Sequence, residues 1–363
     1  MEKNQLIKHP RSNSFLFGHN PSETTFLNSW NSGRIPHGWL LTGPRGIGKA
    51  TLAFRIARFV LSQTNAPTIL GSLENSLSSL AITNDNPIFK RVASGGHPDL
   101  MTLERTLNSE TSRLKTSISV EEARAAGDFL RLTASEGGWR ILIIDSADEL
   151  NLNAANALLK VLEEPPDKTL MLLTCHAPGT LLPTLRSRCS RIQMNPLKYE
   201  DLKNVFEQLS PNINEDNLKT LSYLSEGSPG RALTLAERDG LDIYKELIYL
   251  IRQLPNIEVP LLHKFGDRLS RRGAEDNFHL AIELLVWWIS RLTRMSAKGE
   301  FIPNVIAEEN DCANRLAAET RVDRWIEVWE KINSLASQTD RLNLDRKHVL
   351  LNMFQVLKGA VGG

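Results

Sequence analysis

The first half of the chain alternates short apolar runs with longer stretches in which apolar residues recur at helical spacing. Continuous apolar runs predict buried strands, and apolar residues three and four positions apart predict amphipathic helices. The expected strands are 38–42, 97–103, 139–145, 169–175 and 192–194, and the expected helices are 22–32, 52–61, 119–133 and 153–164. Strands that alternate with helices predict an α/β fold with a parallel sheet covered on both faces.

The second half of the chain has helical spacing only. Three helices are expected first, at 200–209, 216–224 and 231–239, and longer ones follow at 242–254, 259–271, 275–297, 307–317, 319–336 and 345–357. Residues 282–289 (IELLVWWI) are nearly all apolar, which indicates a helix inside a bundle or at a subunit contact. We therefore expect an α/β domain over residues 1–196, a small helical domain over 197–240 and an all-helical domain over 241–363.

Composition narrows the class of protein without assigning a function. The chain has 363 residues, is 41% hydrophobic and carries a net charge of +1, so no global charge argues for nucleic acid or a membrane. Its three cysteines are widely spaced and suit a reducing compartment. The N-terminus has no apolar signal core, and the most apolar window is too short to span a bilayer. We expect a soluble, cytoplasmic protein.

The strongest chemical motif is a glycine loop, GPRGIGKAT, at residues 43–51. Gly43, Gly46 and Gly48 let backbone N–H groups face a phosphate chain, and Lys49 would add a charge at the terminal phosphates. A strand before the loop and a helix after it complete the P-loop (Walker A) context. The pattern expects Ser or Thr next, to ligate Mg²⁺, but this chain has Ala50. Thr51 comes one residue late, about 100° further round the helix.

Asp145 ends an apolar run at 139–145. In an open parallel sheet, ligands bind beyond the carboxyl ends of the strands, so Asp145 is expected where a Mg²⁺–phosphate complex would lie. The alternative is an aspartate that only ends a strand in a turn. The upstream P-loop favours the nucleotide site.

Several segments together resemble the bacterial clamp-loader subunits of the AAA+ family, most closely the delta-prime type. They are GPRGIGKAT (43–51), HPDL (97–100), IIDSAD (143–148), NAANALLKVLEEPP (153–166), LRSRC (185–189) and SEGSPGRAL (225–233). The resemblance covers about residues 15–235. It implies a RecA-like nucleotide domain, a three-helix lid and a helical collar in a five-subunit ring. The implied partners are gamma or tau ATPase subunits, a clamp-binding delta subunit and, through the complex, the sliding clamp and primed DNA.

Two departures from the family bear on cofactors. Many relatives hold a four-cysteine zinc module between the P-loop helix and the HPDL strand, but residues 62–96 contain no cysteine, so no zinc is expected. After the metal-organising aspartate, active AAA+ ATPases carry a glutamate that activates water, whereas this chain has Ser146. With Ala50, this predicts a pocket that can hold ATP or ADP but does not hydrolyse it.

The resemblance also assigns roles to three further residues. Arg188, in the Ser-Arg-Cys (SRC) motif, would be an arginine finger for a neighbour's ATP, rather than one more surface arginine. Arg231 would be the lid's nucleotide-sensing arginine or, equally, a surface charge on a helix. Thr174 would sense the γ-phosphate or simply end a strand.

Four basic residues, Arg113, Lys115, Arg124 and Arg131, either touch duplex DNA or belong to solvated surfaces; solvated surfaces are favoured. Two other functions stay open beside a clamp-loader subunit. A stand-alone P-loop ATPase would need a working pocket, and a nucleotide-sensing regulator without such partners would have no need of the SRC motif. Co-purification with partner subunits would separate these alternatives.

Overall fold

The computed structural model of the chain describes residues 9–63, 77–107, 114–209, 213–299, 305–306 and 309–361. The chain divides into two compact units, Met1–Pro211 with Glu226–Arg231, and Asn212–Ser225 with Ala232–Gly363. Each unit is described by itself. The expected division into three domains, at 1–196, 197–240 and 241–363, stays a prediction.

The first unit is built on one parallel sheet of five strands in the order β2-β3-β4-β1-β5. The strands are β1 (Gly38–Thr42), β2 (Leu100–Leu103), β3 (Arg140–Ile144), β4 (Thr169–Cys175) and β5 (Ser190–Gln193). Every residue of β1, β3 and β4 is buried, as expected for central strands covered on both faces. The expected RecA-like α/β fold is confirmed.

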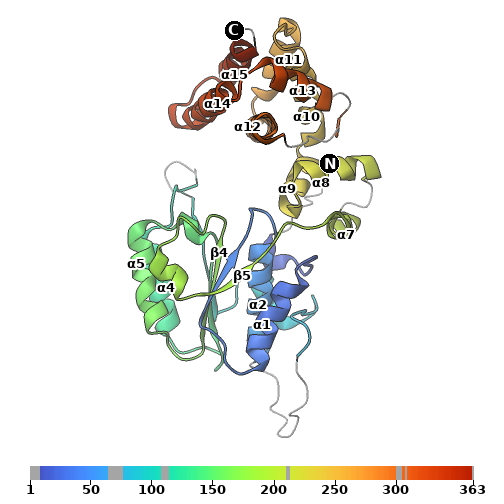
Figure 1. The fold of residues 1–363 in the computed structure, drawn as a ribbon. Coiled ribbons are helices and arrows are strands. Elements are labelled where there is room, and N and C mark those ends of the chain that lie inside the picture. The colour runs from blue at the N-terminus through green and yellow to red at the C-terminus, as the bar shows by residue number, and fades with distance from the viewer. Residues whose placement is uncertain are drawn as a thin grey trace. The chain divides into compact units, whose positions relative to one another are not determined.

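Helices cover both faces of this sheet. Helices α4 and α5 lie on one face, and α1 and α2 lie on the other (Figure 1). The helical elements of this unit are η1 (Pro10–Ser12), α1 (Asn20–Asn31), α2 (Lys49–Gln63), α3 (Pro87–Ala93), α4 (Val120–Arg131), η2 (Ala147–Glu149), α5 (Leu152–Glu163), α6 (Pro183–Ser187) and α7 (Tyr199–Leu209). Ser119 caps α4 in a full capping box with Glu122, which explains why the helix begins where the sequence predicted.

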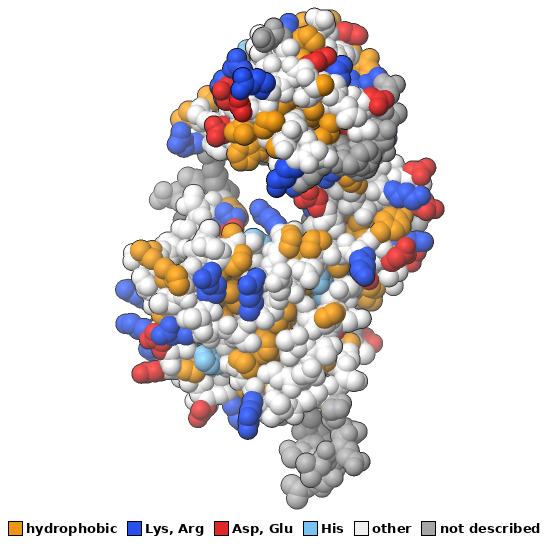
Figure 2. All heavy atoms as spheres, in the orientation of Figure 1, with side chains coloured by type: hydrophobic (Ala, Val, Ile, Leu, Met, Phe, Trp, Pro, Cys, Tyr) orange, Lys and Arg blue, Asp and Glu red, His pale blue; other side chains and the backbone are white. Residues whose placement is uncertain are grey.

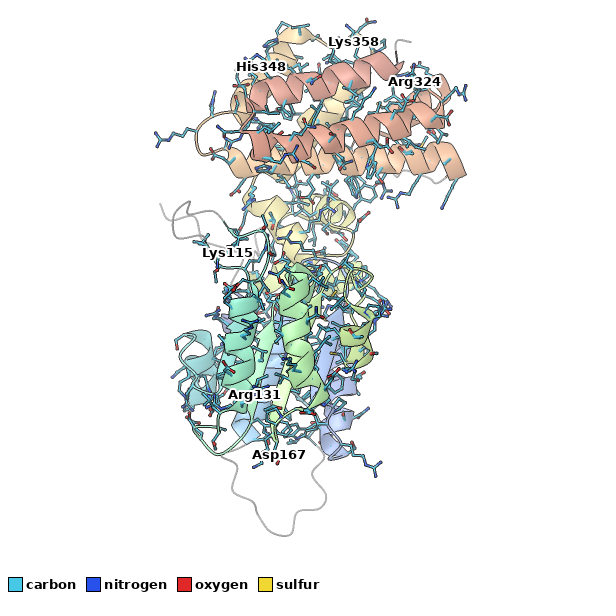
Figure 3. All side chains as sticks on the ribbon, turned by 90° about the vertical axis from the view of Figure 1, so that its left-hand side faces the viewer. Lys115, Arg131, Asp167, Arg324, His348 and Lys358 are labelled. Carbon is cyan, nitrogen blue, oxygen red and sulfur yellow. The ribbon has the colours of Figure 1, made fainter. Side chains whose placement is uncertain are left out.

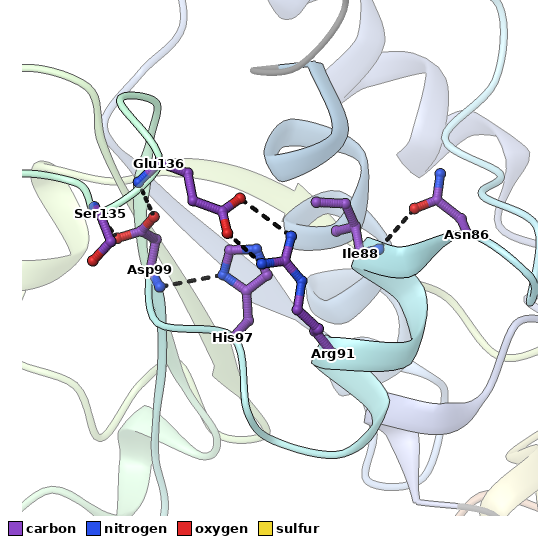
Figure 4. A network of polar contacts seen from close by, with 7 residues as sticks. All are labelled: Asn86, Ile88, Arg91, His97, Asp99, Ser135 and Glu136. Atoms are coloured by element: carbon purple, nitrogen blue, oxygen red, sulfur yellow. Dashed lines mark hydrogen bonds and ion pairs between the residues drawn. The ribbon is translucent and has the colours of Figure 1, made fainter.

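Two expectations about this unit were wrong. Helix α3 was not among the helices expected from the sequence. The strand expected at 97–103 begins only at Leu100, because the residues before it form a turn in which the N–H of Leu100 donates to the carbonyl of His97 at 3.2 Å. The Asp99 carboxylate accepts hydrogen bonds from the backbone of Ser135 at 2.7 Å and Glu136 at 3.2 Å (Figure 4). Residues 64–76, which precede α3, lie outside the described residues.

Within the described residues, the regular elements of the second unit are all helices, as predicted. Its helices are α8 (Glu215–Leu224), α10 (Gly240–Arg252), α11 (Val259–Leu269), α12 (Glu275–Lys298), α13 (Glu309–Glu319), α14 (Val322–Leu342) and α15 (Arg346–Val361); α9 (Pro229–Glu237) begins in the first unit and ends in this one. Trp288 on α12 is fully buried, so the apolar segment 282–289 forms core. Tyr244 donates a hydrogen bond to Glu309, and both side chains are fully buried.

Candidate nucleotide site and an outward arginine

The glycine loop joins β1 to α2 and has the backbone that a P-loop requires. Gly43, Gly46 and Gly48 have φ values of 152°, 75° and 109°, which residues with a Cβ rarely adopt. A Cβ on Gly43 would lie 2.3 Å from the carbonyl oxygen of Met194, at the end of β5. The glycine therefore also lets the loop lie close to the neighbouring strand.

Lys49, the first residue of α2, is bound to its own loop. Its Nζ donates to the carbonyl oxygens of Gly43 at 2.7 Å and Pro44 at 2.6 Å, and the residue is only 3% exposed. Burial lowers the pKa of Lys49 to about 8, and the negative charges of Asp148 and Asp145 oppose that effect in part. An incoming phosphate would have to replace these two carbonyl bonds.

The segment Glu226–Arg231 contributes further bonds to the same loop. Ser228 donates from its hydroxyl to the carbonyl of Arg45 at 2.8 Å, and the backbone N–H of Gly230 donates to the carbonyl of Gly46 at 2.9 Å. The backbone N–H of Arg231 donates to the Ser228 hydroxyl at 3.3 Å. The backbone of Arg231 thus lies beside the P-loop, where the resemblance predicts a nucleotide-sensing arginine. Its sensing role stays a prediction.

Polar side chains gather at the carboxyl ends of β3 and β4. Thr174 donates from its hydroxyl to the Asp145 carboxylate at 2.7 Å, so the structure brings these two predicted residues together. Ser146 follows with φ 59°, a left-handed conformation, and its hydroxyl lies 2.9 Å from Nε2 of His176. The sequence does not predict this contact between His176 and Ser146, because only the fold places the two residues side by side.

The two acidic residues after Ser146, Asp148 and Glu149, have different partners. Asp148 accepts a hydrogen bond from the backbone of His176 at 3.1 Å and contributes to the electrostatics of Lys49. Glu149 instead forms an ion pair with Arg105 at 2.6 Å. Of these two residues, Asp148 is therefore the one whose charge raises the pKa of Lys49.

The groups present fit the phosphates of a nucleotide better than they fit its metal. The glycine backbone and Lys49 match a phosphate chain. Asp145 could hold Mg²⁺, but Ala50 has no hydroxyl, and Thr51 is buried within the first turn of α2. Among the described residues, no group of three or more His, Cys, Asp or Glu side chains is placed to hold a metal ion. Nucleotide binding and the expected lack of zinc both stay predictions.

Arg188 lies at the amino ends of the strands, whereas the P-loop lies at their carboxyl ends. It follows α6 and precedes β5, whose first residue pairs with Trp39 near the start of β1, whereas the loop follows the end of β1. Its Nη1 donates to the carbonyl of Thr184 at 3.0 Å, and its Nη2 lies 2.7 Å from Oε1 of Glu163. The Arg188 side chain is 35% exposed, so it is accessible from solvent.

Of the basic residues considered for DNA contact, Arg124 and Arg131 lie on α4 and Lys115 precedes it. Lys115 and Arg131 lie toward opposite ends of this helix (Figure 3), and Lys115 is paired with Glu122 at 3.1 Å. Arg124 and Arg131 line a groove between α4 and α5 of about 610 Å³, which Asp128 also lines. Acidic and basic side chains are interspersed over the face shown in Figure 2. Arg113 lies outside the described residues, and DNA contact stays a prediction.

No helix in the described ranges is both long and apolar enough to cross a bilayer.

Comparison with known proteins assigns the chain to a family. Residues 18–198 match the family model described as "DNA polymerase III, delta subunit". DNA polymerase III subunit delta-prime of Pseudomonas aeruginosa is 36% identical over 195 residues, 53% of each chain. Subunit gamma of Buchnera aphidicola subsp. Schizaphis graminum is 31% identical over 232 residues, 63% of this chain and 58% of that one.

The similarity is limited in extent. The matched region spans little more than half the length of these relatives. A solved DNA polymerase III gamma subunit-related protein from Thermotoga maritima is 18% identical and aligns over 92% of this chain and 99% of that one. Its TM-score of 0.40 is too low to carry an argument. Because residues 18–198 match this family model, the chain belongs to the clamp-loader family of DNA polymerase III subunits.

Proposed function

We propose that this chain is a delta-prime-type subunit of a clamp loader that does not hydrolyse ATP itself. It joins gamma or tau ATPase subunits and a delta subunit in a five-membered ring and acts as its stator. It donates Arg188 to the ATP site of a neighbouring subunit while the ring loads a sliding clamp onto primed DNA.

The state of its own pocket carries the proposal. Ala50 lacks the hydroxyl that would ligate Mg²⁺, and Ser146 stands where a carboxylate would activate water. Loss of a general base alone typically costs about 10²–10⁴-fold in rate. The Ser146 hydroxyl lies against His176, and Lys49 is bonded to its own loop, which supports a site kept for its shape.

The position of Arg188 supports a role on a neighbouring subunit. Arg188 lies at the amino ends of the strands and the P-loop lies at their carboxyl ends. Arg188 therefore cannot act on the nucleotide pocket of its own subunit. An arginine finger contributes about 10³–10⁵-fold at the site that receives it. Its exposed guanidinium has the charge and planar donor geometry that a γ-phosphate binds.

The test is reconstitution with gamma, delta and the clamp. We expect Arg188→Ala to join the complex normally but to lower its ATP hydrolysis at least about tenfold at saturating clamp and primed DNA. Arg186→Ala is the matched control, because Arg186 is exposed on the same short helix and bonds only weakly, at 3.4 Å to Pro178. Unchanged hydrolysis in Arg188→Ala, or failure to form the complex with wild-type chain, would refute the proposal.

A second arm separates the proposal from a stand-alone ATPase. The purified wild-type chain should hydrolyse no ATP above background, and Lys49→Ala should leave the activity of the complex unchanged. Turnover by the isolated chain that Lys49→Ala abolishes would establish the stand-alone ATPase instead.

A further inference from the structure

The last residue of α5, Glu163, lies against the guanidinium of Arg188. Helix α5 runs antiparallel to the strands. Its last residue therefore lies at the amino ends of the strands, where the chain passes from α6 into β5. Oε1 of Glu163 is 2.7 Å from Nη2 of Arg188. The pair joins two segments that are separated by a whole strand in the sequence.

Arg188 is held from two directions. The Thr184 carbonyl, which belongs to α6 itself, accepts from Nη1 at 3.0 Å, and the Glu163 carboxylate engages Nη2. A guanidinium has five N–H donors, so these two contacts leave donors for a further anion. Arginine has many side-chain rotamers, and contacts of this kind reduce the number that it populates.

We propose that Glu163 is the positioning residue for Arg188. Glu163 keeps the Arg188 guanidinium ordered at the amino ends of the strands before a neighbouring nucleotide arrives. The arginine then loses less conformational freedom when it binds the γ-phosphate. Glu163 touches no nucleotide and acts only through Arg188. This inference rests on the proposed function, because it needs Arg188 to act on a neighbour's ATP.

The partial exposure of the pair suits this role. The side chains of Arg188 and Glu163 are 35% and 48% exposed, so solvent screens their attraction. A screened pair can order the arginine without holding it so strongly that it cannot shift toward phosphate. We therefore expect a moderate effect, about threefold to tenfold in kcat, and not the full effect of an arginine finger.

The experiment is a double-mutant cycle on ATP hydrolysis by the reconstituted complex. Glu163→Ala should lower kcat about threefold to tenfold with little change in KM for ATP, because the finger acts in the transition state. In the Arg188→Ala background it should have no further effect. Glu164→Ala, which removes the adjacent exposed carboxylate, is the matched control and should leave kcat unchanged.

Each result decides something different. An unchanged or higher kcat in Glu163→Ala, while Arg188→Ala is impaired, overturns the positioning role and leaves the proposed function standing. An equal loss in both backgrounds shows a purely structural role and overturns it too. An unimpaired Arg188→Ala removes the proposed function itself. Rescue by Glu163→Asp or Glu163→Gln, which keep an oxygen acceptor, would support positioning over local destabilisation.

Discussion

Lys49 carries a cost in stability that should be visible as a pH dependence. Its pKa is lowered from the ordinary value of 10.5 to about 8 because the ammonium is buried, with only partial compensation from Asp148 and Asp145. At about 1.4 kcal/mol per pKa unit, this difference corresponds to roughly 3 to 4 kcal/mol. The cost is opposed by the two hydrogen bonds of Nζ to loop carbonyls, each worth about 1 kcal/mol.

The sign follows from proton binding. Between pH 8 and 10.5 the unfolded chain holds the Lys49 proton and the folded chain releases it, so the free energy of unfolding rises with pH in this window. Below pH 8 the full cost is present. Lys49→Met should remove this rise and, near neutral pH, should stabilise the protein by about 1 kcal/mol after the lost hydrogen bonds are subtracted.

The assay is urea unfolding of wild type and Lys49→Met at about pH 7 and about pH 10, followed by circular dichroism. The difference between the two proteins isolates Lys49, because other titrating groups are common to both. Lys90→Met is the control, since Lys90 is an exposed lysine of α3. Equal pH slopes in wild type and Lys49→Met would show that Lys49 keeps an ordinary pKa, and the account of a loop closed on its own lysine would be wrong.

Three further predictions concern the framework of each unit, and each is checked by urea unfolding. Asp99→Ala should destabilise the protein by about 3 kcal/mol, because it leaves the buried Arg140 without its carboxylate partner and leaves two backbone N–H groups without their acceptor. Asp128→Ala, at an exposed position, is the control, and a loss below about 1 kcal/mol in Asp99→Ala would contradict the prediction. Gly43→Ala should cost at least about 2 kcal/mol more than Gly137→Ala, because both have positive φ but only Gly43 would place its Cβ against Met194, so equal costs would count against the clash. Burial raises the pKa of Glu309, so its cost is absent at low pH and grows as pH rises above the ordinary value of 4.5; Glu309→Gln should stabilise the second unit at about pH 7 and change little at about pH 4, and the reverse order would refute this.

The sequence predicted the elements whose signal is local. Strands β1, β3 and β4 were recognised because each is a continuous apolar run, and the P-loop because its glycines and lysine are contiguous. Helix α3 had a readable start, since Asn86 caps Ile88 and Pro87 follows it, but the surrounding Ser, Asn and Pro favoured a loop. Asp99, in the turn before β2, binds backbone groups more than 30 residues away, which no local pattern predicts.

The same limit applies to the candidate site. Motifs located Lys49, Asp145, Thr174 and Arg188, and the structure brings Asp145 and Thr174 into contact. The contacts of Ser146 with His176 and of Glu163 with Arg188 join separate segments, so only the fold reveals them. The loop carbonyls that hold Lys49 depend on the detailed path of the backbone, which the motif does not specify.

The separation of the P-loop and Arg188 by the length of β1 gives the first unit a polarity. Five residues of strand, at about 3.3 Å each, put roughly 16 Å between the strand ends with the cradle and the strand ends with the arginine. A contact between the arginine of one subunit and the cradle of the next, repeated in one direction, is heterologous, and such contacts generate rings or open filaments. A member that offers the arginine but has an impaired cradle would therefore mark one end of any catalytic series of sites.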